Sequence, residues 1–250
     1  MWQNKTARRV FAVIFALAVW QIAAMIVDEE FLFPSPVSVT ARLFTLWQED
    51  GFFLAISNSF LKIVSGFLLG LLLGTALALT AARFSIVEDL LWPFMITVKS
   101  VPVASFIVLA LMWLTSKELS TFISFLMVLP IIYTNILSGI KNSSREMDKV
   151  ATVFKMPLGR RILYIWIPRI KPFMLSACSI ALGLSWKAGI AAELIGIPSS
   201  SLGEMLYYSK IYFNTLDLFA WTLIIVLLSI GFEKLFISLL KFTFGRIEKI

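Results

Sequence analysis

The sequence predicts an all-α integral membrane protein with about six transmembrane helices in a single domain, residues 1–250. Three observations indicate this class. Of the 250 residues, 59% are hydrophobic and 15% are charged, whereas about a quarter of a soluble domain is charged. The mean hydropathy is +0.90. Apolar runs of about 20 residues recur along the chain, and each is long enough to cross a bilayer as a helix.

The first expected span, residues 10–27, follows three basic residues, as the core of a secretory signal peptide does. Its apolar run continues to Val27 and exceeds the apolar core of about 7–15 residues that signal peptides carry. We therefore expect a retained span. After it, Pro34 and Pro36 favour an extended elbow, and residues 37–47 are expected to form a short amphipathic helix in the outer interface.

The second expected span, residues 63–82, carries Gly66, Gly70 and Gly74 at intervals of four. This spacing places all three on one face of a helix, where small residues allow another backbone to approach closely. We expect a packing face here. Its partner could be a helix of the same chain or of a second copy.

The third expected span, residues 90–116, contains Pro93 and Pro102, and the fourth, residues 119–140, contains Pro130. Prolines kink helices and free backbone carbonyls, which a membrane tolerates only where protein or a water-filled cavity surrounds them. Such kinks are typical of a transport pathway more than of a passive anchor.

Three charges lie inside expected spans: Lys99 in the third, and Lys187 and Glu193 in the fifth, residues 172–197. A charge at the bilayer centre costs about 2.5–3.5 kcal/mol on insertion scales, so each needs a partner or water. Two interpretations stay open. One is a polar path for an anionic solute, with four neighbouring side chains as further candidates: Ser100, Ser105, Ser185 and Trp186. The other is structural ion pairing or snorkelling to the surface.

The distribution of basic residues predicts the orientation. With the N-terminus inside, and with the sixth span at residues 218–240, the inner segments hold 16 Lys and Arg residues and the outer loops hold 3. Basic residues collect on the cytoplasmic side, so both termini and the segment 141–171 are expected to be cytoplasmic. The same bias explains the net charge of +7, and no nucleic-acid partner is expected.

The segment 141–171 carries eight basic residues and two acidic ones. Ser143 and Glu146 fit a capping box that begins a short helix through about Phe154, and a second helical run over 160–166 is expected to end at Pro168. Interleaved apolar residues favour a protein-docking surface over a solvated loop held by anionic lipids. The docking candidates are Glu146, Asp148, Lys149, Ala151, Phe154, Lys155, Met156 and Gly159.

Several function classes are disfavoured by missing residues. The chain has no histidine and one cysteine, Cys178, so a metal centre or a nucleophile with a histidine base is not expected. It also lacks the G-x-x-x-x-G-K-[ST] phosphate loop. We therefore expect a transport subunit without enzyme activity or cofactor, energised by a separate chain.

At these residues the chain resembles the type I membrane permease subunits of binding-protein-dependent ABC importers, in particular the nitrate, sulfonate and taurine type. The motif at 33–36, Phe-Pro-Ser-Pro, is similar to the opening of that family's outer loop, and 182–186 and 192–196 are similar to its fifth helix. In the cytoplasmic signature, Ala151 and residues 165–168 match. Lys149 stands where the family has Glu, and Lys155 where it has Gly.

The resemblance implies a homodimer of permeases in a bacterial-type cell membrane. It further implies two ABC ATPase subunits that bind ATP and magnesium at the cytoplasmic coupling helices, and an external solute-binding protein. The solute would be a small anion such as a sulfonate or nitrate, with a vitamin precursor or amine as the alternative. A self-sufficient channel or secondary carrier is the competing class.

Overall fold

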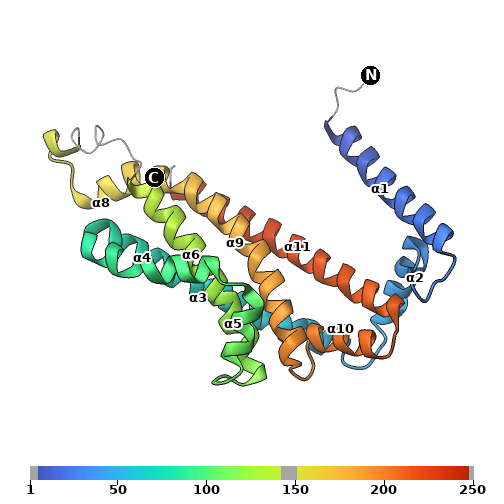
Figure 1. Cartoon of the computed structure of the whole chain (residues 1–250). Coiled ribbons are helices and arrows are strands. Elements are labelled where there is room, and N and C mark those ends of the chain that lie inside the picture. The colour runs from blue at the N-terminus through green and yellow to red at the C-terminus, as the bar shows by residue number, and fades with distance from the viewer. Residues whose placement is uncertain (1–4, 142–150, 248–250) are drawn as a thin grey trace.

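The computed structural model describes residues 5–141 and 151–247, and all regular structure in these ranges is helical, as predicted (Figure 1). In chain order the elements are α1 (Lys5–Val27), α2 (Pro36–Leu46), α3 (Phe52–Arg83), α4 (Ser85–Ser100), α5 (Val103–Ala110), α6 (Ser116–Lys141), α8 (Leu158–Arg161), the π-helical turn η1 (Ile162–Trp166), α9 (Ile167–Gly196), α10 (Leu202–Ile211) and α11 (Thr215–Ile247).

Five helical stretches of the described chain are long and apolar enough to cross a membrane: Thr6–Val27, Phe52–Arg83, Ser116–Lys141, Tyr164–Gly196 and Thr215–Arg246. The third expected span, 90–116, is not one helix, because α4 and α5 meet at an angle of 104°. Pro102 explains the break: the residue before a proline is pushed out of the helical region, and Val101 is extended (φ −79°, ψ 133°). The count reaches six only if this bent pair is one span.

The helix expected in the elbow is confirmed as α2. Pro36 occupies its first turn, where no backbone N–H is needed, and the Ser35 hydroxyl accepts a hydrogen bond from the Ser38 N–H at 3.1 Å. Pro36, one of the two prolines that interrupt the chain after α1, therefore also starts the next helix.

The glycine face of α3 packs against α6 of the same chain. A methyl group built on Gly66 would lie 2.4 Å from the Thr121 carbonyl oxygen, and one on Gly70 would lie 2.7 Å from the Val128 side chain. One on Gly74 would lie 3.0 Å from Ile132. The two backbones approach closely over about two helical turns because these positions carry no Cβ. On its other side, α6 packs against α9, and these three helices form the centre of the bundle.

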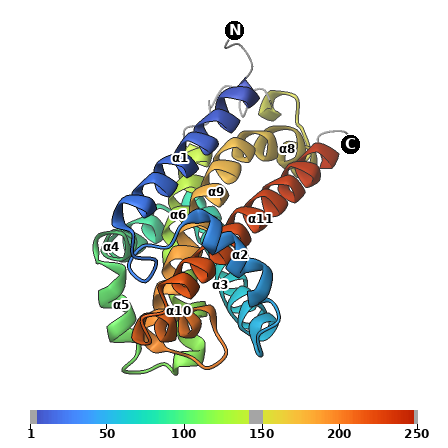
Figure 2. The ribbon, with the colours of Figure 1, turned by 90° about the vertical axis from the view of Figure 1, so that its right-hand side faces the viewer.

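The views in Figure 1 and Figure 2 agree on the ends of the bundle. The start of α1, helix α8 and the end of α11 lie at one end, and α10 lies at the opposite end. This arrangement fits the expectation that both termini and the segment 141–171 share one side of the membrane. That this side is the cytoplasm stays a prediction.

Helix α1 stands apart from the central helices, and no residue of its most apolar window is buried (Figure 1). It is tied to the rest near its C-terminal end. There the Trp20 indole N–H donates to the Pro34 carbonyl at 3.2 Å, and its ring packs on Phe219 of α11 with the centroids 5.8 Å apart.

The second helical run of the segment 141–171 differs from the prediction. It does not end at Pro168, since α8 continues through the π-helical turn η1 into α9. Pro168 lies in the first turn of α9, where proline is tolerated, and Pro172 lies inside that helix. The fifth span therefore begins before residue 172. The predicted start of the first run, at Ser143, lies outside the described residues.

Candidate functional site

The break between α4 and α5 brings three path candidates to the surface of the chain. Lys99, Ser100 and Ser105 are all exposed and flank the extended backbone at Val101. The Lys99 ammonium donates to the Thr134 hydroxyl at 3.2 Å, and that hydroxyl donates to the Pro130 carbonyl at 2.7 Å. A cation beside non-helical backbone in a membrane protein is typical of a polar pathway.

The candidates on α9 divide between two faces. Lys187 is exposed and has no hydrogen-bond or ion-pair partner in the described part of the chain. Ser185 and Trp186 are buried. The Ser185 hydroxyl donates to the Leu182 carbonyl at 2.8 Å, and the Trp186 ring packs on Phe60 with the centroids 6.0 Å apart. Within one chain, Lys187 alone of these three is accessible to a solute.

Glu193 is enclosed where α3, α6, α9 and α10 meet. Its side chain has no exposed surface, and its Oε2 accepts a hydrogen bond from the Ser59 hydroxyl at 2.6 Å. The Gly203 N–H in the first turn of α10 donates to the same oxygen at 3.3 Å. Ser59 and Glu193 lie 134 positions apart, so no local pattern could have predicted their contact.

The described part of the segment 141–171 after the gap begins with a helical turn at Ala151, which is buried, followed by exposed Val153 and Phe154. Lys155 then has a positive φ of 49°, the left-handed conformation that glycine adopts without penalty. The Met156 N–H donates to the Ala151 carbonyl at 2.9 Å and closes the turn. Lys155 is the residue aligned with the signature glycine, so the turn is made in spite of the substitution.

The other docking candidates are placed only in part. Gly159 lies in α8. Glu146, Asp148 and Lys149 lie outside the described residues. Four large apolar side chains of the described portion are exposed: Val153, Phe154, Tyr164 and Trp166. Val153 and Phe154 are the most exposed of them, and of the four only Phe154 is among the docking candidates.

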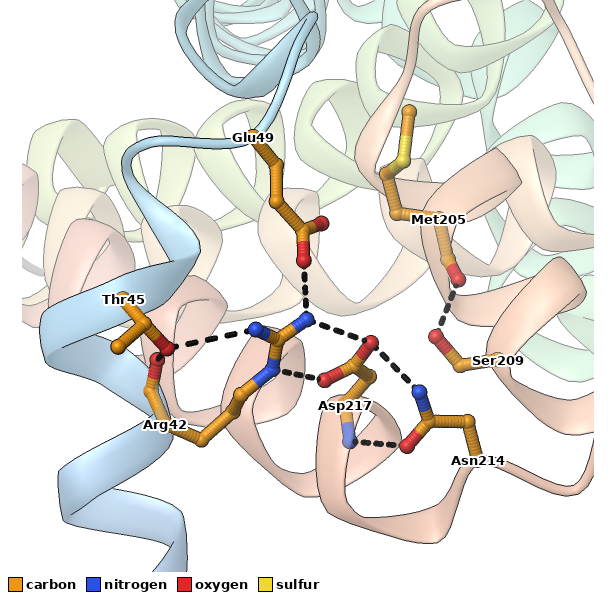
Figure 3. A network of polar contacts seen from close by, with 7 residues as sticks. All are labelled: Arg42, Thr45, Glu49, Met205, Ser209, Asn214 and Asp217. Atoms are coloured by element: carbon orange, nitrogen blue, oxygen red, sulfur yellow. Dashed lines mark hydrogen bonds and ion pairs between the residues drawn. The ribbon is translucent and has the colours of Figure 1, made fainter.

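A polar network at the opposite end joins α2 to the start of α11 (Figure 3). The Arg42 guanidinium forms a two-point ion pair with Asp217, in which Nη2 lies 3.0 Å from Oδ2, and it also pairs with Glu49. Asn214 donates to the Asp217 carboxylate at 2.7 Å. The hydrogen bonds to Asp217 raise the pKa of Arg42, so the guanidinium stays charged.

Sequence reasoning missed this network because Arg42 and Asp217 lie 175 positions apart. Arg42 is one of the three basic residues that the orientation count places in the outer loops, and the sequence assigns it no other role. The sequence does show one basic residue in the elbow helix and one acidic residue at the start of the last span. These two charges alone do not predict that the residues are in contact.

Comparison of the sequence with known proteins identifies the family of this chain. The model of the binding-protein-dependent transport system inner membrane component matches residues 66–242. The putative aliphatic sulfonates transport permease protein SsuC of Bacillus subtilis is 26% identical over 83% of this chain and 76% of its own length. The nitrate import permease protein NrtB of Synechocystis is 25% identical over 78% and 74%.

A third relative is named for the transport of a different kind of solute. The formylaminopyrimidine transport permease protein ThiX of Halalkalibacterium halodurans is 24% identical over 89% of each chain. The family match covers more than half of the chain, including α6, the π-helical turn and α9, and most of α3 and α11. The chain therefore belongs to the family of binding-protein-dependent transport system inner membrane components.

Proposed function

We propose that this chain forms the translocation path of an ATP-driven importer for a small anion. The observation that carries the transport role is the family match over residues 66–242, which includes the bent pair α4–α5 and the central helices. A self-sufficient channel or carrier is not favoured, because this family works with a binding protein.

Two observations support an anionic solute. Relatives are named for aliphatic sulfonates and for nitrate, both anions. Lys99 and Lys187 are exposed cations on helices of the described chain, and neither forms an ion pair there. A cation at membrane depth that is not neutralised within the chain favours an anion in its vicinity. The ThiX relative supports the second candidate, a pyrimidine-type vitamin precursor.

The partners follow from the family and from the resemblance. An external binding protein would deliver the solute, and two ATPase subunits would hold ATP and magnesium. A second copy of this chain would complete the path. The exposed residues Val153 and Phe154 and the turn at Lys155 support docking of an ATPase at the segment 141–171, which we place in the cytoplasm with both termini.

The test is reconstitution of this chain with its ATPase and binding protein in liposomes. Uptake of sulfonate, nitrate or a formylaminopyrimidine is measured with and without ATP inside. ATP-dependent uptake that requires the binding protein supports the proposal. Uptake by the chain alone would establish a channel or carrier instead.

Deletion of residues 146–156 tests the docking site separately. The expected result is loss of co-purification with the ATPase while the permease remains in the membrane. Retained co-purification would move the docking site elsewhere.

A further inference from the structure

Glu193 is the one charged side chain of the described residues that is completely buried. We propose that it is a positioning residue. It fixes the start of α10 against α3 and α9 and thereby holds the outer end of the path, and it does not contact the solute. This inference rests on the proposed function, because its main readout is transport.

Hydrogen bonds link Ser59, Glu193 and the start of α10. The Leu202 N–H donates to the Ser59 hydroxyl oxygen at 2.8 Å, and the Ser59 hydroxyl donates to Glu193 Oε2 at 2.6 Å. The Gly203 N–H also donates to Oε2. The first turn of every helix leaves N–H groups without intrahelical partners, and here two of them are capped by side chains of α3 and α9. A carboxylate at this position is also favoured by the helix dipole.

The same helix start carries its own cap. The Ser201 hydroxyl accepts from the Glu204 N–H at 3.1 Å, and the Glu204 carboxylate accepts from the Ser200 N–H. The contacts from Ser59 and Glu193 are therefore not needed to begin the helix. Their distinct effect is to join it to the rest of the bundle.

The junction is too tight to admit a solute. A methyl group built on Gly203 would lie 2.3 Å from Glu193 Cβ and 2.4 Å from its carbonyl carbon. Asn58 adds a second tie from α3, because its amide donates to the Ser200 carbonyl at 2.9 Å. The α9–α10 corner is therefore held to α3 at two successive residues, Asn58 and Ser59.

The second oxygen of the Glu193 carboxylate suggests a variant that distinguishes a positioning role from a solute-binding role. Glu193 Oε1 and the Ser120 hydroxyl are both buried without a hydrogen-bond partner in the described chain, and Ser120 lies beside the carboxylate. In Glu193→Gln, the amide oxygen can accept from Ser59 and Gly203, and the amide nitrogen can donate to Ser120. Glutamine thus meets the geometric requirement without a charge, whereas a group that binds a solute or carries a proton would lose its chemistry.

The experiment compares complexes that carry wild-type permease, Glu193→Gln, Glu193→Ala or Ser59→Ala in proteoliposomes. The readouts are the amount of assembled complex, the uptake rate and the half-saturating concentration of loaded binding protein. Glu118→Ala is the matched control, because Glu118 caps its own helix through Thr115 and forms no hydrogen bond or ion pair with a second helix among the described residues.

We expect Glu193→Gln to transport within about twofold of wild type, and Glu193→Ala to lose about tenfold or more, since it leaves two buried donors unsatisfied. Ser59→Ala should lose activity as well, while Glu118→Ala should not. If Glu193→Ala fails to assemble, Ser59→Ala and Glu193→Gln decide the matter.

Three results would overturn the inference: loss of transport in an assembled Glu193→Gln complex, wild-type transport by Glu193→Ala, or wild-type transport by Ser59→Ala. Absence of transport in the wild-type complex would instead contradict the proposed function.

Discussion

Replacing Gly66 by alanine should separate α3 from α6. The added methyl group would lie 2.4 Å from the Thr121 carbonyl oxygen and 2.8 Å from Ser124 Cβ. Carbon–carbon contacts are optimal at about 3.5–4.0 Å, so the helices must move apart locally by roughly 1 Å. The Thr121 contact is with backbone and cannot be relieved by a change of rotamer.

The expected cost is about 1–3 kcal/mol from overpacking, reduced by the gain of up to about 1 kcal/mol that alanine brings to a helix interior. The close contact predicts a gradient, in which Gly66→Ala costs more than Gly70→Ala and Gly74→Ala costs least, because their shortest contacts are 2.4, 2.7 and 3.0 Å. A loss of 1 kcal/mol lowers the melting temperature by about 2–4 °C in a soluble domain of this size.

The assay is thermal unfolding of the detergent-solubilised permease, followed by size-exclusion chromatography of the heated samples. Gly231→Ala in α11 is the matched control, because a methyl group there meets nothing within 4 Å in the described chain. It should leave the melting temperature unchanged or slightly higher. Equal melting temperatures for Gly66→Ala and Gly231→Ala would refute the close-packing argument.

Three further predictions follow from charged and strained positions. Arg42→Gln should break both ion pairs of the network and increase chymotrypsin cleavage between α1 and α3, whereas Arg42→Lys should restore part of the protection; identical chymotrypsin digestion patterns would contradict this. Lys155→Gly should stabilise the cytoplasmic turn by about 1 kcal/mol, since a side chain at positive φ is disfavoured, and should retain or strengthen ATPase binding in a pull-down, with weaker binding as the contrary result. Lys99→Ala should reduce anion uptake without lowering the melting temperature, because the ammonium is exposed and has one neutral partner, and Lys99→Arg should recover uptake; unchanged uptake in Lys99→Ala would remove this lysine from the path.

Features that depend on short-range periodicity were predictable from the sequence. Four of the six expected spans lie within long helices, and the helix after the proline elbow is present. The helix ends were predicted less well, because α3 begins at Phe52 and the second span was expected to begin at residue 63. The glycine interval of four identified the face of α3 that packs closely. Its partner could not be identified, because helix pairing in a membrane depends on shape complementarity between segments that are distant in sequence.

The errors concern prolines. Pro102 was expected to kink a span and instead breaks it, since Val101 is extended and α5 begins after it. Pro168 was expected to end a helix and instead lies in the first turn of one. The same residue type produces both outcomes, depending on whether the preceding carbonyls find partners, and that depends on tertiary packing.

The polar contacts of Glu193 and Arg42 lay beyond sequence reasoning for a different reason. The prediction that Glu193 needs a partner is correct. Its nearest lysine along the helix, Lys187, is not that partner, because it lies on another face and is exposed. The actual partners are a serine hydroxyl and a backbone N–H, groups too common to single out in a sequence.

The separation of α1 from the central helices has a consequence for how this protein can diverge. The family match begins at residue 66, after α1 and α2, and α1 contacts α2 and, through the Trp20 ring, α11. Changes along most of its lipid-accessible length therefore do not require compensating changes in the bundle. We expect the N-terminal helix to tolerate changes in length and composition that the glycine-lined contact of α3 with α6 would not tolerate.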